Sequence, residues 1–368
     1  MKKANLFLIS TIIISLLAGC AGTPVVYYSD CTCPTGSHEI AATEAPVVAD
    51  PLPGEIPAVE GEGSLKTGLY ISTSISDSKS ADGENAGEAK YDVTMVAVLV
   101  DDNGIIHDCV IDGITTSVKF DASGAFVTDL AAAPLTKNEL GENYGMVAYG
   151  KAIAEWDTQA EALAQYAIGK DAVELRTMAI DETGYAPEGS DLATSATIYL
   201  GGYVEAIAIA AGTAKHLGAQ VGDELKLAAV TGIDSSKPAD AENAGNAQLD
   251  VTVTALTLKD SVITSCYIDA VQAKVAFDAA GTITSEIGGM VSTKNQLGEQ
   301  YGMKAWGGAI AEWDQQAASF AAYVTGKTAD EVAGIAVTET TKPADADLAS
   351  SVTIAIGGFQ ALIAKAAQ

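Results

Sequence analysis

Histidine and cysteine are scarce in this chain of 368 residues, which holds three of the former and five of the latter. These side chains supply many catalytic bases, nucleophiles and zinc ligands, and no His-Glu-x-x-His helix, nucleophile elbow or phosphate loop occurs. His107 has no paired base and nucleophile around it, and the acidic loops 80–85 and 238–243 lack the ligand order of an EF-hand. The sequence therefore favours a non-catalytic protein and shows no metal site of these known patterns.

Basic side chains are few as well. Only 20 Lys and Arg stand against 48 Asp and Glu, a formal net charge of −28. A surface of this sign repels nucleic acid and anionic lipid head groups, so we exclude nucleic acid as a partner. The same charge favours solubility and is compatible with cations or basic partners. So few cysteines also exclude a small scaffold stapled by disulfides.

The N-terminus lacks a hydrophobic run long enough to stay in a membrane. Its apolar stretch, Leu6–Leu17, is about 12 residues long, whereas a helix needs roughly 20 residues to span a bilayer. Lys2 and Lys3 precede this stretch and Leu-Ala-Gly-Cys20 follows it, which is the order of parts in a signal peptide. The sequence therefore predicts that residues 1–19 are removed.

The Leu-Ala-Gly-Cys20 motif resembles the lipobox of bacterial lipoproteins. That resemblance implies that the Cys20 thiol takes a diacylglyceryl group and becomes the N-terminus after cleavage. Each buried lipid CH₂ contributes about 0.8 kcal/mol, so a palmitate-type anchor of several chains holds durably. We expect a lipoprotein attached to the cell membrane by lipid and facing outside the cytoplasm, with the bilayer as its partner.

Residues 20–65 contain the predicted lipidation site and a tether. After Cys20 this segment holds six of the ten prolines, seven acids and no Lys or Arg. Such a composition favours an extended chain, which at about 3.1 Å per residue reaches on the order of 100 Å. Cys31 and Cys33 lie in the tether, and both a metal ligand pair and a disulfide remain open for them.

An internal repeat dominates the rest of the sequence. A shift of 157 residues aligns Thr136–Met146 with Thr293–Met303, where nine of eleven residues are identical. A period this long indicates a duplicated domain rather than a solenoid. We expect two tandem copies, residues 66–216 and 217–368, each long enough to bury its own core.

Each copy changes from strand to helix patterning midway. In the first copy, stretches rich in Val, Ile and Thr are separated by Asn-Gly and Ser-Gly turns and predict an antiparallel meander. The predicted strands are Tyr91–Val100, Ile105–Asp112 and Ser117–Phe120, and the second copy repeats the pattern over residues 248–284. Cys109 and Cys266 hold the same position on mostly apolar strand faces, so both are predicted to be small core residues.

Helices are predicted to follow the strands. Apolar residues recur every three to four positions and place two tryptophans on buried stripes. These stripes comprise Ile153, Trp156, Ala160, Leu163 and Ala167, and Ile310, Trp313, Ala317, Phe320 and Val324. A shorter helix is expected after Gly326 and another from Asp345 or Asp347, with Thr or Asp as N-cap. This last helix is expected to include Val352-Thr-Ile354 and Gly357-Gly358. The predicted fold class is α+β, two tandem copies of an antiparallel sheet with helices packed on one side.

The best candidate for a ligand-binding site is the loop that joins sheet to helix. Its glycines permit tight bends, and Lys, Asn and Tyr side chains are suited to lining a pocket. A demanding backbone path explains the match between copies equally well. The candidate residues are Lys137, Asn138, Tyr144, Lys294, Asn295 and Tyr301. Glu155 and Glu312, just before the tryptophans, are expected to point into solvent.

A second resemblance concerns the start of each copy. Gly68-Leu-Tyr70 and the turn Asp102-Asn-Gly104 followed by Val-Ile-Asp112 resemble FMN-binding domains of flavin-bearing lipoproteins over about 60 residues. Those families attach FMN through a hydroxyl that closes a Ser/Thr-Gly-Ala-Thr/Ser motif. Here the matching segments are Ser123–Phe126 and Ala280–Ile283, and Phe126 has no hydroxyl. The resemblance therefore implies noncovalent flavin binding, or an ancestor whose flavin site has been lost.

Two hypotheses for function follow. The first is a non-catalytic, surface-displayed protein whose two copies bind a small molecule or a cell-envelope partner. The second is an FMN-binding electron-transfer lipoprotein.

Overall fold

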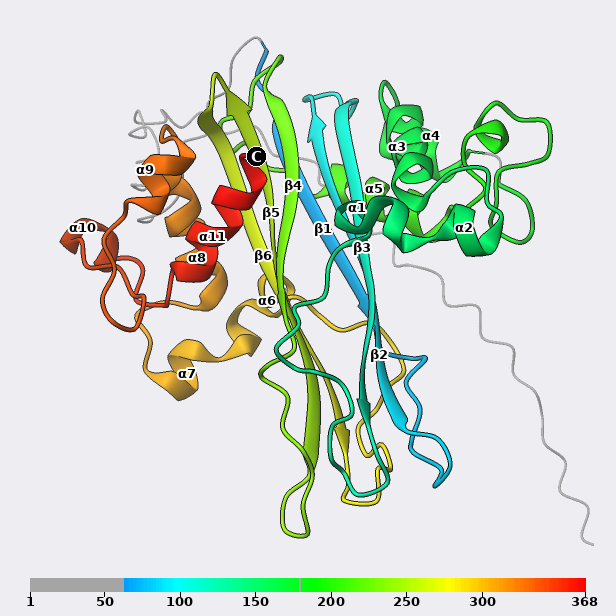
Figure 1. The fold of residues 1–368 in the computed structure, drawn as a ribbon. Coiled ribbons are helices and arrows are strands. Elements are labelled where there is room, and N and C mark those ends of the chain that lie inside the picture. The colour runs from blue at the N-terminus through cyan, green and yellow to red at the C-terminus, as the bar shows by residue number, and fades with distance from the viewer. Residues whose placement is uncertain (1–62, 179) are drawn as a thin grey trace, which may run out of the picture. The chain divides into compact units, whose positions relative to one another are not determined.

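The computed structural model describes residues 63–178 and 180–368 (Figure 1). The predicted signal peptide, the lipidation site Cys20, and Cys31 and Cys33 lie outside the described residues. We call residues 66–216 the first half and residues 217–368 the second half.

Two antiparallel three-stranded sheets form the centre of the fold. The first has the order β1-β2-β3 and the second β4-β5-β6. Their strands are β1 (Lys66–Ser74), β2 (Gly87–Val100), β3 (Ile106–Phe120), β4 (Glu224–Gly232), β5 (Gly245–Lys259) and β6 (Val262–Phe277). The α+β class with antiparallel sheets is confirmed.

The predicted meander was partly wrong. The strand expected at Ser117–Phe120 is the end of a continuous β3, and the third strand of the sheet is β1, which the strand prediction missed. Residues 113–116 hold no turn sequence, and Ile114-Thr-Thr116 favours an extended backbone, so β3 continues through them.

The two sheets pack face to face with a core between them. Inward-facing side chains of both halves make up this shared core. Phe120 and Phe277 stack in it with ring centroids 3.9 Å apart and planes 4° apart. Backbone bonds also cross between the halves, from Ala81 N–H to Gly281 O (2.8 Å) and from Ala239 N–H to Gly124 O (3.0 Å). The described residues accordingly belong to one compact unit.

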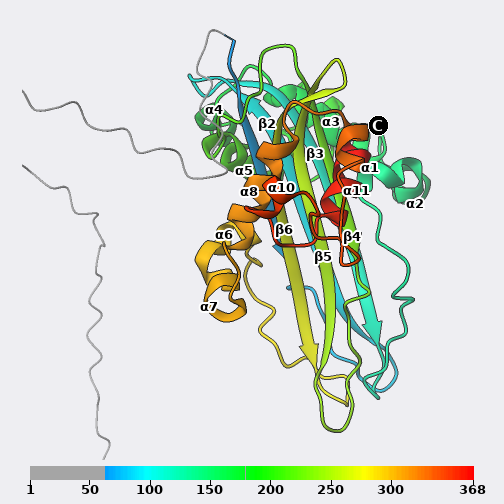
Figure 2. The ribbon, with the colours of Figure 1, turned by 90° about the vertical axis from the view of Figure 1, so that its left-hand side faces the viewer.

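Helices cover the outer face of each sheet, and each half buries a second core beneath them. The long helices are α3 (Trp156–Ala167), α5 (Gly201–Gly212), α8 (Trp313–Val324) and α11 (Gly357–Ala366). Helices α3 and α5 lie on one side of the paired sheets, and α8 and α11 lie on the other (Figure 1). In Figure 2, α8 and α11 cover the upper part of β4–β6, and the strands extend below them.

Short helices complete each half. In the first half they are α1 (Lys137–Leu140), η1 (Gly141–Tyr144), α2 (Met146–Gly150), α4 (Ala172–Arg176) and η2 (Leu192–Thr194). In the second half they are α6 (Lys294–Leu297), η3 (Gly298–Tyr301), α7 (Met303–Gly307), α9 (Ala329–Ala333) and α10 (Ala346–Ala349). The predicted N-caps are confirmed, because Thr328 caps α9 and Asp345 caps α10. The expected continuation of the last helix through Val352-Thr-Ile354 was wrong, because these β-branched residues disfavour a helix and the chain forms the separate helices α10 and α11.

The buried tryptophans are also confirmed, but the predicted stripes began too early. Trp156 and Trp313 are the first residues of α3 and α8 and are buried. Ile153 and Ile310 lie before these helices and are 57 % and 53 % exposed. Each of them follows a left-handed residue that ends the preceding short helix, which breaks the helical period.

Candidate functional site

The two sheet-to-helix loops adopt the same backbone path. Thr136 and Thr293 each form a capping box at the start of α1 and α6. Gly145 and Gly302 have φ of 81° and 80°, a left-handed conformation that favours glycine. The matching sequences of the two loops thus have matching backbone geometry, as expected if a demanding backbone path explains their similarity.

Asn138 and Asn295 tie these loops to the sheets. The Asn138 amide donates to Ile111 O at 3.0 Å, and the Asn295 amide donates to Ile268 O at 3.0 Å. Their backbone N–H groups donate to the buried carboxyls of two strand aspartates, Asp112 in β3 (3.1 Å) and Asp269 in β6 (3.0 Å). Burial raises the pKa of both carboxyls, that of Asp269 to about 6. These bonds favour an anchoring role for the asparagines.

Lys137 and Lys294 lie over aromatic rings. The Lys137 ammonium is 5.2 Å from the ring centroid of Tyr144 and 4.7 Å from that of Trp156. In the second half, the Lys294 ammonium is 5.0 Å from the Tyr301 ring and 4.8 Å from the Trp313 ring. Such cation–π contacts place a positive charge on one side of each tryptophan. Burial lowers the pKa of Lys294, while the charge of nearby Asp250 acts in the opposite direction.

The expectation that Glu155 and Glu312 point into solvent was wrong. Glu155 accepts hydrogen bonds from the N–H groups of the first two α2 residues at 2.8 and 3.0 Å. Glu312 does the same for α7 at 2.7 and 3.0 Å and is only 3 % exposed. A helix start leaves backbone N–H groups without intrahelical partners, and these carboxylates satisfy two of them. Both residues fasten the loop to the long helix that follows.

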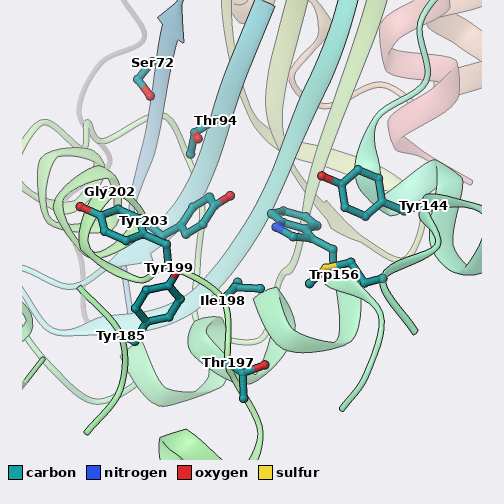
Figure 3. Close-up of a pocket in the computed structure, with 11 residues that line it drawn as sticks. Ser72, Thr94, Tyr144, Trp156, Tyr185, Thr197, Ile198, Tyr199, Gly202 and Tyr203 are labelled. Atoms are coloured by element: carbon teal, nitrogen blue, oxygen red, sulfur yellow. The ribbon is translucent and has the colours of Figure 1, made fainter. Parts of the chain in front are cut away.

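A pocket of about 540 Å³ opens on the outer side of the first sheet (Figure 3). It is bounded by β1, β2, the candidate loop and the segments that begin α3 and α5. Aromatic rings supply much of its wall, namely Tyr144, Trp156, Tyr185, Tyr199 and Tyr203. Smaller side chains complete it, namely Ser72, Thr94, Met146, Thr197, Ile198 and Gly202. Among the six predicted site residues, Tyr144 lines this pocket.

Most hydroxyls that line this pocket make no hydrogen bond to other described residues of the protein. Thr197 donates to Gln159 Oε1 at 3.0 Å. Within the described part of the chain, the other six hydroxyls make no hydrogen bond, and they belong to Ser72, Thr94, Tyr144, Tyr185, Tyr199 and Tyr203. In Figure 3 the indole nitrogen of Trp156 lies on the side of the ring that faces Tyr203. The pocket thus combines apolar ring faces with free polar groups, as small-molecule sites do.

The corresponding positions of the second half are different. Ser72 pairs with Thr94 across β1 and β2, whereas Val230 pairs with Thr252 across β4 and β5. Tyr301, the counterpart of Tyr144, donates its hydroxyl to Gln272 at 2.9 Å. The second half therefore has Val230 in place of Ser72, and its Tyr301 hydroxyl is hydrogen-bonded within the protein.

Three more tyrosines of the pocket have no tyrosine counterpart. Tyr199 stands just before the N-cap of α5, and Ala355 stands just before the N-cap of α11. Tyr203 and Phe359 are the third residues of these helices. Tyr185 follows Gly184, whose carbonyl accepts a hydrogen bond from Leu200 N–H. In the second half the corresponding bond runs from Ile356 N–H to Thr341 O, so Lys342 is the counterpart of Tyr185. An aromatic pocket rich in hydroxyls is thus a property of the first half.

Sequence reasoning missed most of this pocket because it searched the segments in which the two halves match. Tyr185, Tyr199 and Tyr203 lie where the halves differ. The sequence signal that could have identified them is a set of tyrosines present in the first half and absent at the corresponding positions of the second.

The described cysteines and acidic turns have structural roles. Cys109 and Cys266 are buried without a disulfide among the described residues, which confirms them as core residues. Burial raises the pKa of both thiols, that of Cys266 to about 12. Asp82 and Asp240 each accept hydrogen bonds from the backbone and the amide of an asparagine three residues later. Across residues 63–178 and 180–368, no cluster of three or more His, Cys, Asp or Glu side chains is placed to bind a metal.

Of the helices that the structure describes, none has the length and apolar character needed to cross a bilayer. No protein-family model, curated protein or solved structure matches the chain.

Proposed function

We propose that this protein is a lipid-anchored, non-catalytic binding protein that faces outside the cytoplasm and holds a small molecule in the pocket of its first half. The observation that carries the proposal is the set of six free hydroxyls among five aromatic rings. A volume of about 540 Å³ lies within the range of roughly 300–1,000 Å³ common for ligand pockets.

The anchor is supported by the sequence alone. Two lysines, a short apolar run and Leu-Ala-Gly-Cys20 follow one another in the order of a lipoprotein signal. The acidic, proline-rich residues after Cys20 then act as a spacer between membrane and pocket. Changing Cys20 to Ser should move the protein from the membrane fraction to a soluble one, and mass spectrometry should find an acylated N-terminus only with Cys20. Equal fractionation of both forms would refute the anchor.

We further propose that the two halves are tandem copies of one domain, residues 66–216 and 217–368, which diverged after duplication. The loop sequences with nine of eleven identities and their equal glycine dihedrals support this origin. In this account the first copy retained or gained a ligand pocket, and the second copy serves the shared core.

An FMN-binding, electron-transferring lipoprotein is the second candidate. Its support is the aromatic wall, since a flat isoalloxazine ring can stack on an exposed tyrosine such as Tyr199. The pocket lining holds no Lys or Arg for the FMN phosphate, and Lys137 beside it is already engaged with two rings. This absence ranks flavin below an uncharged ligand.

Purified protein with Cys20→Ser distinguishes the candidates. Its absorbance near 450 nm, before and after equilibrium dialysis against FMN, reports bound flavin. A screen of neutral, cationic and anionic small molecules by ligand-dependent melting reports any other ligand. A chain that takes up neither flavin nor any other compound would overturn the proposed binding function.

A further inference from the structure

The charge of the pocket restricts its ligand. None of its lining residues carries a charged side chain, and the whole chain has a net charge of −28. An anion finds no basic lining residue and is repelled by the surrounding protein. A cation approaching Trp156 or Tyr144 meets the ammonium of Lys137, which already lies 4.7 and 5.2 Å from these rings. The pocket therefore favours a neutral ligand.

The polar groups of the pocket indicate that this neutral ligand carries several hydroxyls. Six lining hydroxyls have no partner among the residues that the structure describes. Each can donate and accept a hydrogen bond. A purely apolar ligand would leave these groups without water and without partners, at a cost for each of them. A polyol or sugar satisfies them instead.

The rings indicate that the ligand also has a flat apolar face. Tyr199 is 52 % exposed, yet its ring packs edge to face on Tyr185, with centroids 6.0 Å apart and planes 84° apart. A Cβ on Gly184 would come within 2.2 Å of this ring, so glycine makes room for it. The rings of Trp156 and Tyr203 also pack together, with centroids 5.8 Å apart. The negative ring faces attract the C–H groups on one side of a pyranose ring.

The second half lacks this arrangement as a whole. Ala355 replaces the exposed tyrosine, and Thr341 stands where Gly184 stands in the first half. Where the ring is gone, the glycine that accommodates it is gone too. The exposed tyrosine and the glycine that leaves room for its ring are thus both found in the first half and absent at the corresponding positions of the second.

We infer that the first-half pocket binds a neutral saccharide, with Tyr199 as a stacking platform. This inference rests on the proposed binding function and specifies its ligand class.

The test uses the full chain with Cys20→Ser and three neutral trisaccharides, maltotriose, cellotriose and N,N′,N″-triacetylchitotriose. FMN, riboflavin and choline serve as comparison probes. Saturation-transfer NMR should show magnetisation passing to ring C–H protons of at least one trisaccharide. Tyr199→Ala, which installs the residue of the second half, should weaken its binding about tenfold, since an aromatic contact is worth up to about 1.5 kcal/mol.

Trp306→Ala is the matched control. Trp306 is 90 % exposed, lies in the second half and does not line the pocket, so its loss should leave binding unchanged. Saccharide binding that is as strong in Tyr199→Ala as in the parent protein, or that disappears in Trp306→Ala, would overturn the assignment to this pocket. Tyr199-dependent binding of FMN, riboflavin or choline without any trisaccharide would overturn the ligand class and leave the binding function standing. Failure of all six probes would overturn the saccharide inference, and the wider screen described above would then decide the binding function itself.

Discussion

Asp269 offers a pH-dependent test of how the second-half loop is anchored. Its carboxyl is buried at the junction of β6 and the loop, where it accepts from the N–H groups of Ala270 (2.7 Å) and Asn295 (3.0 Å). Burial raises the pKa of this carboxyl to about 6, although hydrogen bonds and the charge of Lys215 act to lower it. The folded protein therefore holds this proton at pH values where the unfolded chain releases it.

The sign of the effect follows from proton binding. Between the unfolded pKa of about 3.9 and the folded value, the folded state binds more protons, so stability falls as pH rises. The contribution is fully present below the unfolded pKa and is lost as pH rises through the folded pKa. With these values, wild-type protein loses roughly 1.4 kcal/mol of unfolding free energy between pH 5 and pH 8 from this one group.

Asp269→Asn keeps an oxygen acceptor and cannot ionise. Urea unfolding followed by tryptophan fluorescence should therefore show the variant gaining about 1.4 kcal/mol relative to wild type from pH 5 to pH 8. Glu286→Gln, at an exposed position, is the control and should show no such trend. A difference between Asp269→Asn and wild type that stays constant with pH would refute the reasoning.

Three further predictions concern the fold. Asn295→Ala removes the bond to Ile268 O and should cost about 1–3 kcal/mol in urea unfolding; an unchanged value contradicts the anchoring role. Phe277→Ala should cost about 3–5 kcal/mol while the protein still unfolds in one transition, because its ring lies in the shared core; two transitions would contradict that core. Cys109 and Cys266 should react with a thiol reagent only on unfolding, because burial raises both pKa values; fast labelling of either residue in native protein, located by peptide mapping, would contradict this.

Local patterns predicted the parts of the fold that depend on neighbouring residues. The Val-rich alternation, the Asn-Gly turn after Asp101 and the spacing around both tryptophans correspond to β2, β3, α3 and α8. The prediction ended one strand at Asp112 and began another at Ser117, although no turn sequence separates them. The Ser123-Gly124 turn lies beyond Phe120, where β3 ends.

Packing between the sheets was harder to predict. Period-two alternation identifies one buried face, but Met95–Val100 is a continuous apolar run, which is typical of a strand buried on both faces. That run was the sequence signal for a sheet covered by helices on one side and by another sheet on the other. Which sheet it would meet depends on contacts such as Phe120 against Phe277, whose residues are 157 positions apart.

The candidate site was predicted only where the sequences of the two halves agree. Tyr144 lies in the repeated loop and lines the pocket, whereas Tyr199 and Tyr203 come from the divergent segment around the start of α5. Their convergence depends on how α5 packs against β1 and β2. No short-range pattern encodes that arrangement.

Ligand-dependent melting of a double variant tests the binding account most directly. Ser72→Val with Tyr199→Ala gives the first half two pocket residues of the second half. With the best-binding compound from the screen, the account predicts a raised melting temperature for the Cys20→Ser protein and a much smaller rise for the double variant at the same ligand concentration, while both melt alike without ligand. An equal rise in the two proteins would contradict it.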